Sequence, residues 1–440
     1  MRRAIVPVRC LLACLACSTL CGPRVATAAE APAAGKNTVL WISVDGNRGD
    51  YVDRGQSPFL KSLMEHGAYT KQLVPIFPSL TFPSHVSEAT GVGAGLHGIV
   101  SNKFKDTSLG QEYNMPSDPN LLQAEPIWIT AARQGVRSAV WDWPLSQKED
   151  KLPAGSPHAT IFNPSDKFDQ NETDTQRLEN LVDVYRKDFD VPNHQEPLRL
   201  LMGYCFAIDH AGHVAGPEAE ATTKAVHEAD QVLQKIVEEV ADIFQKHAQP
   251  GDKLYVLITA DHGMDTVKTL VNARKLIGGA DVPDSVVVDT SGSLANVYLN
   301  DVPGPQRDAV KQAIIARLKD APFVKFWLRE DLPEKFAYAN NSRTGDIVIN
   351  MQAGYDFSTH IDGITAPAES DARAMKGMHG YDPAEDRKML GFAVLSCWGS
   401  ELPGKDLGEV STLRLHPTVA KLLGIKPAAG ASAPTIEAVP

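Results

Sequence analysis

The sequence predicts an α/β protein in which helices flank a mostly parallel central β-sheet. Two observations predict this class. Short apolar runs recur along the chain, and continuous apolar runs suit strands that are buried on both faces. Stretches with apolar residues at helical spacing lie between these runs, and such alternation is typical of parallel sheets. In these sheets, functional sites form beyond the carboxyl ends of the strands.

Five apolar runs are predicted to form the strands of the main sheet. They span residues 38–44, 138–141, 198–208, 254–259 and 391–395. The first run ends at Asp45, the third ends at Asp209, and the fourth leads to Asp261. Helices are predicted over residues 57–66, where Gly67 follows as a stop signal, and over residues 221–245.

Residues from about 270 to 375 have a different pattern. Strand-like runs with partial alternation occur there beside an amphipathic stretch over residues 306–318. We therefore expect a smaller, mixed α+β lobe inserted in a main domain that spans residues 36–426. The segment 427–440 is rich in alanine and proline, and its low complexity predicts a disordered tail.

Residues 1–28 have the pattern of a signal peptide. Arg2 and Arg3 form a basic start, residues 4–20 are mostly apolar, and Ala26-Thr27-Ala28 is a small-residue cleavage pattern. An N-terminal anchor is the alternative, but the apolar run is too short and broken for a transmembrane helix. We expect cleavage, export to the periplasm or the medium, and no stable membrane span in the mature chain.

The net charge of -11 bears on the partners of the protein. An acidic chain is unsuited to binding duplex nucleic acid through a basic surface. It does not exclude a small anionic substrate, because a bound metal can supply local positive charge. A small-molecule substrate is therefore the expected partner.

Carboxylates and imidazoles gather directly after three predicted strands and in one glycine-flanked loop. These residues are Asp45, Asp209, His213, Asp261, His262 and His379. Each alone has a simpler explanation, since an aspartate at a strand end is usually a turn former or helix cap. Together they form a set of oxygen and nitrogen ligands that Zn²⁺ favours, although Mn²⁺ or Fe²⁺ fits as well. Shared between two ions, they leave each with open coordination, which suits catalysis.

The other histidines near or outside these motifs are not expected to bind metal. His210 lies beside the aspartate motif but is not assigned as a ligand. Surface or packing positions are expected for His66, His158, His194, His227, His247 and His416.

A hydroxyl-rich motif precedes a helix predicted over residues 83–90. Thr81 or Ser84 could simply cap this helix. The same position suits catalysis, because free backbone N–H groups at a helix start favour an anion. A bound metal could then make the Thr81 hydroxyl a nucleophile. The motif alone favours the cap.

Six motifs occur in one order along the chain and cover about residues 38–424. They are Asp45, Phe77-Pro78-Ser79-Leu80-Thr81-Phe82-Pro83-Ser84-His85, Gly98-Ile99-Val100-Ser101-Asn102, Asp209-x-x-x-His213, Asp261-His262-Gly263 and Met378-His379-Gly380. This order resembles the nucleotide pyrophosphatase/phosphodiesterase family (type I phosphodiesterases) of the alkaline phosphatase superfamily. The resemblance implies an alkaline-phosphatase-like core and an enzyme that hydrolyses nucleotide phosphodiester or pyrophosphate bonds to nucleoside 5′-monophosphates.

The resemblance also implies two Zn²⁺ per chain and a division of the ligands. One ion is held by Asp209, His213 and His379. The other is held by Asp45, Asp261 and His262 and touches the Thr81 hydroxyl. Thr81 is then the nucleophile that forms a covalent phosphothreonine.

Further residues match substrate-binding positions of the family. By the resemblance, Asn102 and the backbone N–H of Phe82 bind phosphoryl oxygens. Phe82 and Tyr204 match aromatic positions that sandwich a nucleobase, with core packing as the alternative for Tyr204. The chain departs from many members at Asn47, Arg48 and Leu80, and these departures bear on substrate preference.

Two kinds of alternative stay open. The same two-metal core serves phosphomonoesterases, phosphonate hydrolases and phospholipid-headgroup hydrolases. An arginine near the site favours a dianionic monoester, and Arg48 is the candidate. A secreted metal-dependent binding protein without turnover is an alternative of another class, and the position of Thr81 at a helix start argues against it.

Overall fold

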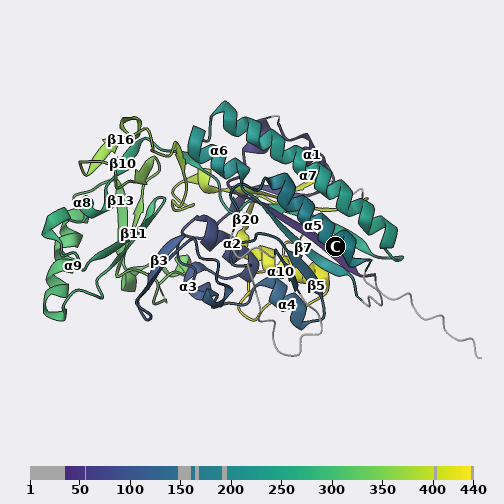
Figure 1. The fold of residues 1–440 in the computed structure, drawn as a ribbon, viewed down its shortest axis with the longest axis horizontal. Coiled ribbons are helices and arrows are strands. Elements are labelled where there is room, and N and C mark those ends of the chain that lie inside the picture. Colours follow the sequence, from purple (N-terminus) through teal and green to yellow (C-terminus); the bar gives the residue numbers. More distant parts are fainter. Residues whose placement is uncertain are drawn as a thin grey trace, which may run out of the picture. The chain divides into compact units, whose positions relative to one another are not determined.

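A nine-stranded sheet forms the core of the computed structural model (Figure 1). The structure describes residues 35–54, 56–146, 160–163, 168–190, 196–339, 341–400 and 404–437. The predicted signal peptide, His158 and His194 lie outside these residues. Among the described residues, no helix is both long enough and apolar enough to cross a lipid bilayer.

The sheet is mostly parallel, as predicted. Its strands follow the order β19 (Lys405–Asp406), β2 (Gly67–Val74), β18 (Gly391–Cys397), β8 (Lys253–Thr259), β1 (Asn37–Val44), β7 (Leu198–Cys205), β5 (Arg137–Val140) and β6 (Thr160–Phe162), and β20 (Glu409–Ser411) pairs with β2. The five strands from β8 to β6 run parallel, whereas β18 is antiparallel to both of its neighbours. The carboxyl ends of β8, β1 and β7 therefore meet at one edge of the sheet.

Strand β1 illustrates why helices must cover both faces of the sheet. Leu40 and Ile42 belong to one apolar core, Val39 and Trp41 belong to the other, and all four side chains are fully buried. The first core is closed by α1 (Pro58–Glu65), α5 (Asp174–Asp188) and α7 (Glu220–His247), and the second by α4 (Ile127–Arg133) and α10 (Leu415–Leu423). Figure 1 shows these two groups of helices on opposite sides of the strands.

Strand β7 is shorter than predicted, and this difference places Asp209 on a helix. The run over residues 198–208 stops at Cys205, and α6 (Ala207–Ala215) begins two residues later. The Asp174 carboxylate accepts hydrogen bonds from the backbone N–H groups of Phe206 and Ala207, at 2.9 and 3.2 Å. Because these donors at the start of α6 are satisfied by another helix, α6 needs no cap of its own. Asp209 therefore lies on a helix.

The segment between β8 and β18 contains a second sheet with its own apolar core. This antiparallel sheet has the order β11 (Val287–Ser291), β12 (Leu294–Tyr298), β14 (Ile347–Met351) and β13 (Val324–Leu328). Helix α9 (Gly304–Lys319) packs on it through Ile314 and Leu318. Smaller elements in the same segment are β9 (Asp265–Thr266), β10 (Thr269–Val271), α8 (Ala273–Leu276), β15 (Tyr355–Phe357), β16 (Thr365–Pro367) and β17 (Gly377–Met378).

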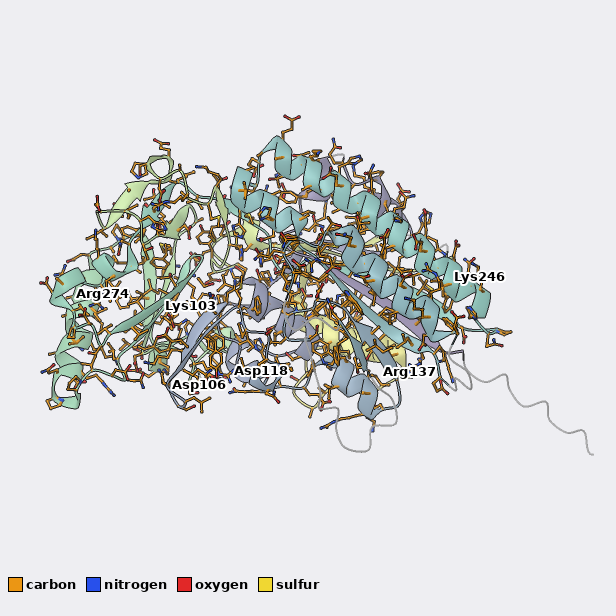
Figure 2. The ribbon with its side chains drawn as sticks, in the orientation of Figure 1. Lys103, Asp106, Asp118, Arg137, Lys246 and Arg274 are labelled. Atoms are coloured by element: carbon orange, nitrogen blue, oxygen red, sulfur yellow. The ribbon has the colours of Figure 1, made fainter. Side chains whose placement is uncertain are left out.

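A hairpin from an earlier part of the chain packs against this second sheet. It consists of β3 (Lys103–Asp106) and β4 (Gln111–Asn114) and follows helices α2 (Thr81–Thr90) and α3 (Ala94–His97). Lys103 lies 2.8 Å from Asp289 of β11, and Asp106 lies 3.0 Å from the Arg343 guanidinium. Figure 2 labels Lys103 and Asp106 on the hairpin. These two ion pairs fix the hairpin that follows Asn102 against the second sheet.

The prediction of a disordered tail is wrong for the part that the structure describes, up to Glu437. Ala431 and Ile436 are each 4% exposed. The backbone N–H groups of Ala428 and Ile436 donate to His416 Nε2 and Thr418 Oγ1, both at 2.9 Å. The composition of the segment predicts disorder because apolar residues are few, but these few are buried and the neighbouring backbone donors find partners on α10.

His416, which anchors this segment, gives a testable dependence of stability on pH. Its Nδ1–H donates to the Ala89 carbonyl at 2.7 Å, and its Nε2 accepts from Ala428. Burial lowers the pKa of His416 from 6.5 to about 4. The unfolded chain binds a proton near pH 6.5 while the folded chain does not until about pH 4, so stability falls as the pH falls through this window.

We expect His416 to account for the loss of roughly 3 kcal/mol at most between neutral pH and pH 4. Urea unfolding at pH 7, pH 5 and pH 4 measures this loss. His416→Gln can donate and accept as the imidazole does but cannot titrate, so the variant should lose less stability over the same interval. Equal losses for the parent and the variant would contradict the assignment.

Candidate active site

Six side chains from separate parts of the chain meet beyond the carboxyl ends of β1, β7 and β8. Asp45 directly follows β1, Asp261 and His262 follow β8, and His379 follows β17. Asp209 and His213 occupy positions i and i+4 of α6, so they lie on the same face of that helix. The structure thus brings together all six residues that the sequence analysis assigned as metal ligands.

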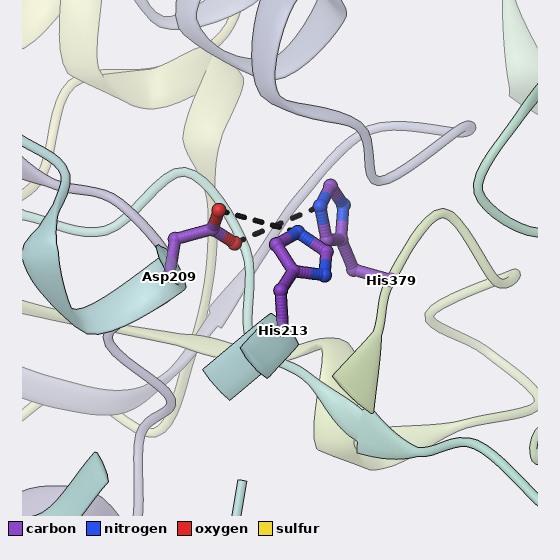
Figure 3. Close-up of side chains that lie close together, drawn as sticks. All are labelled: Asp209, His213 and His379. Atoms are coloured by element: carbon purple, nitrogen blue, oxygen red, sulfur yellow. Dashed lines mark ion pairs between the residues drawn. The ribbon is translucent and has the colours of Figure 1, made fainter. Parts of the chain in front are cut away.

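Asp209, His213 and His379 form the first group of candidate ligands (Figure 3). His213 Nε2 lies 3.2 Å from Asp209 Oδ2, and His379 Nε2 lies 3.7 Å from Asp209 Oδ1. Figure 3 shows both rings facing the carboxylate. Two ligand atoms bound tetrahedrally to one Zn²⁺ at about 2.1 Å lie about 3.4 Å apart. The separations in this group are therefore close to those of ligands that share an ion.

Asp45, Asp261 and His262 form the centre of a second group. His262 Nε2 lies 3.0 Å from Asp261 Oδ2 and 3.3 Å from Asp45 Oδ1. Asp45 and His262 also lie close to Asp209, within a set of three ligand atoms less than 4.8 Å from one another. The two groups are thus contiguous, and the division of the six ligands between two ions stays a prediction.

Backbone carbonyls orient all three histidines in the same way. The Nδ1 atoms of His213, His262 and His379 lie 2.8, 2.9 and 3.0 Å from the carbonyl oxygens of Gly377, Gly263 and Ser79. A carbonyl only accepts, so Nδ1 carries a proton and Nε2 faces the carboxylates. Metal-binding histidines are typically held by such an outer hydrogen bond. Burial and the neighbouring His262 lower the pKa of His379 to about 3, which keeps that ring in the neutral form that binds metal.

Unpaired carboxylate oxygens indicate that the site fits cations. Asp45 Oδ1, Asp209 Oδ1 and Asp261 Oδ2 are buried and have no hydrogen-bond partner. Burial and the adjacent Asp261 and Asp209 raise the pKa of Asp45 well above its ordinary value. Buried anionic oxygens are costly unless they are paired or bound to a metal. The residues present therefore fit metal ions with mixed oxygen and nitrogen coordination.

Thr81 lies at the edge of the second group, at the first position of α2. Helix α2 begins at Thr81, two residues earlier than predicted, and Leu80 is the cap residue. Thr81 therefore does not cap the helix, and its Oγ1 lies 3.3 Å from His262 Nε2 instead. The side chain is 8% exposed. The helix start therefore places a hydroxyl beside the candidate ligands.

Asn102 is held beside Thr81 by the chain itself. Its Oδ1 accepts a hydrogen bond from the backbone N–H of Phe82 at 3.0 Å. The side-chain amide therefore presents its NH₂ as the donor for a ligand. The predicted bond from Phe82 N–H to a phosphoryl oxygen competes with this one, and both substrate contacts stay predictions.

Tyr204 is placed differently from what a base-stacking role suggests. The residue is 7% exposed, and its hydroxyl donates to Asp45 Oδ2 at 2.6 Å. The rings of His85 and Phe168 contact it edge to face, with centroids 5.2 and 5.7 Å away. Tyr204 thus contacts a candidate ligand directly, whereas the stacking of a base on Phe82 and Tyr204 stays a prediction.

Removing only the hydroxyl of Tyr204 distinguishes its contact with Asp45 from a role in stacking a base. Tyr204→Phe keeps the ring but leaves Asp45 Oδ2 without its donor, so we expect a loss of metal affinity of roughly tenfold. Competition with a zinc chelator measures the affinity. If base stacking is instead the main role, Tyr204→Phe should bind zinc like the parent and keep its KM for a nucleotide diester.

His85 is a site residue that the sequence analysis did not single out. It is fully buried, and its Nδ1 lies 2.9 Å from the Thr81 carbonyl and 3.3 Å from Asp261 Oδ2. Its Nε2 lies 2.9 Å from Ser43 Oγ. In the sequence, His85 follows Thr81 by four residues, and on one helix this spacing could have indicated that the two residues are neighbours. By contrast, His210 is exposed and belongs to neither ligand group, as expected.

The fold and the site together indicate a metal-dependent hydrolase, with a buried threonine hydroxyl beside two groups of candidate ligands at the end of a parallel sheet. The sequence profile of the type I phosphodiesterase / nucleotide pyrophosphatase family matches residues 39–382. The chain belongs to this family, and it is a hydrolase of phosphodiester or pyrophosphate bonds.

Individual relatives and a solved structure agree with this assignment. An uncharacterized pyrophosphatase/phosphodiesterase of Schizosaccharomyces pombe is 26% identical, with 89% of this chain and 77% of the relative covered. A bis(5′-adenosyl)-triphosphatase of Xenopus laevis is also 26% identical, with 84% and 74% covered. Murine ectonucleotide pyrophosphatase/phosphodiesterase 5, an inactive variant in complex with AMP, has a similar fold, with a TM-score of 0.73, 20% identity and 91% and 97% of the two chains covered. The predicted alkaline-phosphatase-like fold class is thereby confirmed.

Proposed function

We propose that this enzyme hydrolyses nucleotide phosphodiester or pyrophosphate bonds to nucleoside 5′-monophosphates through a covalent phosphothreonine on Thr81. One observation carries the proposal. The Thr81 hydroxyl lies at the start of a buried helix, 3.3 Å from His262 Nε2 and beside buried carboxylate oxygens that have no partner. A hydroxyl in this position is suited to attack phosphorus, and the Asn102 amide beside it offers a donor for the negative charge that develops.

Each residue of the site has a definite part in this reaction. Thr81 Oγ1 forms a bond to phosphorus, the bond to the leaving alcohol or pyrophosphate breaks, and water later cleaves the phosphothreonine. Asn102 donates its NH₂ to a phosphoryl oxygen and so fixes the orientation of the substrate. The ligand set fits two Zn²⁺ per chain, which when bound supply Lewis acidity for the nucleophile and the leaving oxygen.

The surroundings of Arg48 argue for a diester and against a dianionic monoester. Arg48 is the arginine that favours a monoester by sequence, but its side chain is 6% exposed and donates to Asp50, Glu218 and the Met264 carbonyl. A phosphate dianion would have to displace these partners. Diester hydrolysis is therefore the better supported activity.

Nucleotides are the substrate class that the relatives support. AMP is the ligand of the murine structure, and the Xenopus relative is named for a dinucleoside triphosphate. We propose that the base lies against Phe82, which is half-buried at the start of α2. AMP should then inhibit the diesterase reaction as a product.

We also propose that the enzyme is exported and acts in the periplasm or the medium. The basic, apolar and small-residue pattern of residues 1–28 supports removal of a signal peptide. The murine neighbour is named an ectonucleotide enzyme, which agrees with this location. The catalytic domain then comprises residues 36–426, with the inserted lobe over about residues 270–375.

Turnover of two chromogenic substrates tests the proposed function. The zinc-loaded protein should hydrolyse p-nitrophenyl thymidine 5′-monophosphate much faster than p-nitrophenyl phosphate. A preference for the monoester would overturn the diester assignment and move the enzyme to the phosphatases. Activity on neither substrate would refute the nucleotide proposal and leave a phosphonate hydrolase, a phospholipid-headgroup hydrolase or a metal-dependent binding protein.

A further inference from the structure

We propose that Arg48 is a positioning residue that fixes the two ligand groups relative to each other. This proposal rests on the metal site of the proposed function and assigns Arg48 no contact with substrate. Candidate ligands reach the sheet edge from four regions, namely the loop after β1, helix α6, the loop after β8 and the segment after β17. The Arg48 guanidinium bonds to Asp50 after β1, to the loop after β8 and to the turn that follows α6.

The Arg48 side chain begins in the loop that carries Asp45 and ends against the loop after β8 and the turn after α6. Its Nη1 donates to the Met264 carbonyl at 2.9 Å, two residues after His262. Its Nη2 donates to Glu218 Oε1 at 2.7 Å, in the turn that connects α6 to α7. Asp50 accepts from both Nε and Nη2 and holds the guanidinium plane in place.

The methylene stem of Arg48 packs directly on the residue after His262. A Cβ placed on Gly263 would lie 2.9 Å from Arg48 Cγ and 2.0 Å from the Lys388 carbonyl oxygen. Only glycine fits there without displacing backbone. The position of the loop that carries Asp261 and His262 is therefore set by Arg48 on one side and by the Lys388 backbone on the other.

Met264 extends this contact to the first ligand group. Its sulfur lies where a Cβ on Gly212 or Gly377 would approach within 2.4 or 2.6 Å. Gly212 precedes His213 on α6, and the Gly377 carbonyl accepts the Nδ1–H of His213. Arg48 holds the Met264 backbone, and the Met264 sulfur packs against both Gly212 of α6 and Gly377 of β17. A shift of Arg48 is thus expected to disturb both ligand groups.

Arg54 offers a matched control within the same ion-pair network. It donates to Asp50 Oδ2, to Glu218 Oε2 and to the Pro217 carbonyl, and its guanidinium lies over the Tyr51 ring, as that of Arg48 does. Within the described residues, Arg54 makes no hydrogen bond to the loop after β8. Replacement of Arg54 by lysine therefore removes similar guanidinium hydrogen bonds and a similar cation–π contact without releasing Met264.

Zinc binding by the metal-free protein tests the proposal. Zinc alone is titrated into the protein in competition with a fluorescent chelator, and thermal unfolding of the metal-free forms checks the fold. Arg48→Lys cannot reproduce the fork of donors, so we expect a loss of zinc affinity of roughly 10–100-fold. Arg54→Lys should stay within about threefold of the parent, as is typical of partly exposed ion pairs.

Equal zinc affinities for Arg48→Lys and Arg54→Lys would refute the positioning role while leaving the proposed function intact. Failure of the parent protein to bind zinc would instead refute the metal site and this proposal with it. If Arg48→Lys does not fold, Met264→Ala tests the same arrangement, because it removes the sulfur between Gly212 and Gly377. A parent-like zinc affinity for Met264→Ala would likewise overturn the proposal.

Discussion

Replacing Thr81 by alanine is expected to lower turnover of a nucleotide diester by on the order of 10³-fold or more, because the nucleophile of a covalent mechanism is removed. Zinc binding should persist, since the carboxylates and imidazoles that surround Thr81 are unchanged. Turnover and zinc content of the same preparation measure both effects. The combination distinguishes loss of a nucleophile from loss of the metal site.

Thr90 provides the control for disturbance of α2. It is buried at the other end of the same helix, and its hydroxyl donates to the Val86 carbonyl, within the helix. Thr90→Ala removes the same atoms from the same helix without touching a ligand, so turnover should change little. Parent-like turnover of Thr81→Ala would refute the covalent mechanism, and an equal loss in both variants would point to the helix rather than the nucleophile.

The sequence predicted that the candidate ligands lie close together because several of them directly follow strands. Asp45 and Asp261 follow apolar runs that had to be strands of one sheet, and parallel strands bring their carboxyl ends together. The grouping of Asp209 with His213 and His379 was expected from the family resemblance, and the structure places these residues together. The prediction that Thr81 is the nucleophile also depended on the family resemblance, because a hydroxyl before a helix is more often a cap.

Contacts between distant segments could not be predicted in the same way. Asp174, on α5, accepts hydrogen bonds from the first backbone N–H groups of α6. The point where β7 ends and α6 begins is therefore set by a distant residue, and no local pattern marks it. The hydroxyl of Tyr204 reaches Asp45 because β7 and β1 are neighbours in register, and sequence does not give register. Ile436 is buried at the end of a segment whose composition predicts disorder. In each case one long-range contact outweighs the local preference.

Two histidines of α6, His213 and His210, allow the first ligand group to be tested on one helix. His213→Ala removes a ligand from the group of Asp209 and His379 and leaves the Gly377 carbonyl without its donor. We expect zinc content to fall from two ions to one per chain. The loss of zinc affinity at that group should exceed the roughly 10–100-fold that is typical of outer hydrogen-bond partners. Diester turnover should fall with it, because both ligand groups border the reacting phosphate in the proposed function.

His210→Ala is the matched control, since His210 is exposed, lies three residues before His213 on α6 and contacts the Phe206 ring rather than a ligand. This variant should keep two zinc ions and turn over the diester like the parent. Zinc content by metal analysis and turnover on the same samples decide the outcome. If His213→Ala retained both ions, the assignment of Asp209, His213 and His379 to one metal would be wrong. Retention of two ions with lost turnover would mean that His213 acts on the substrate instead.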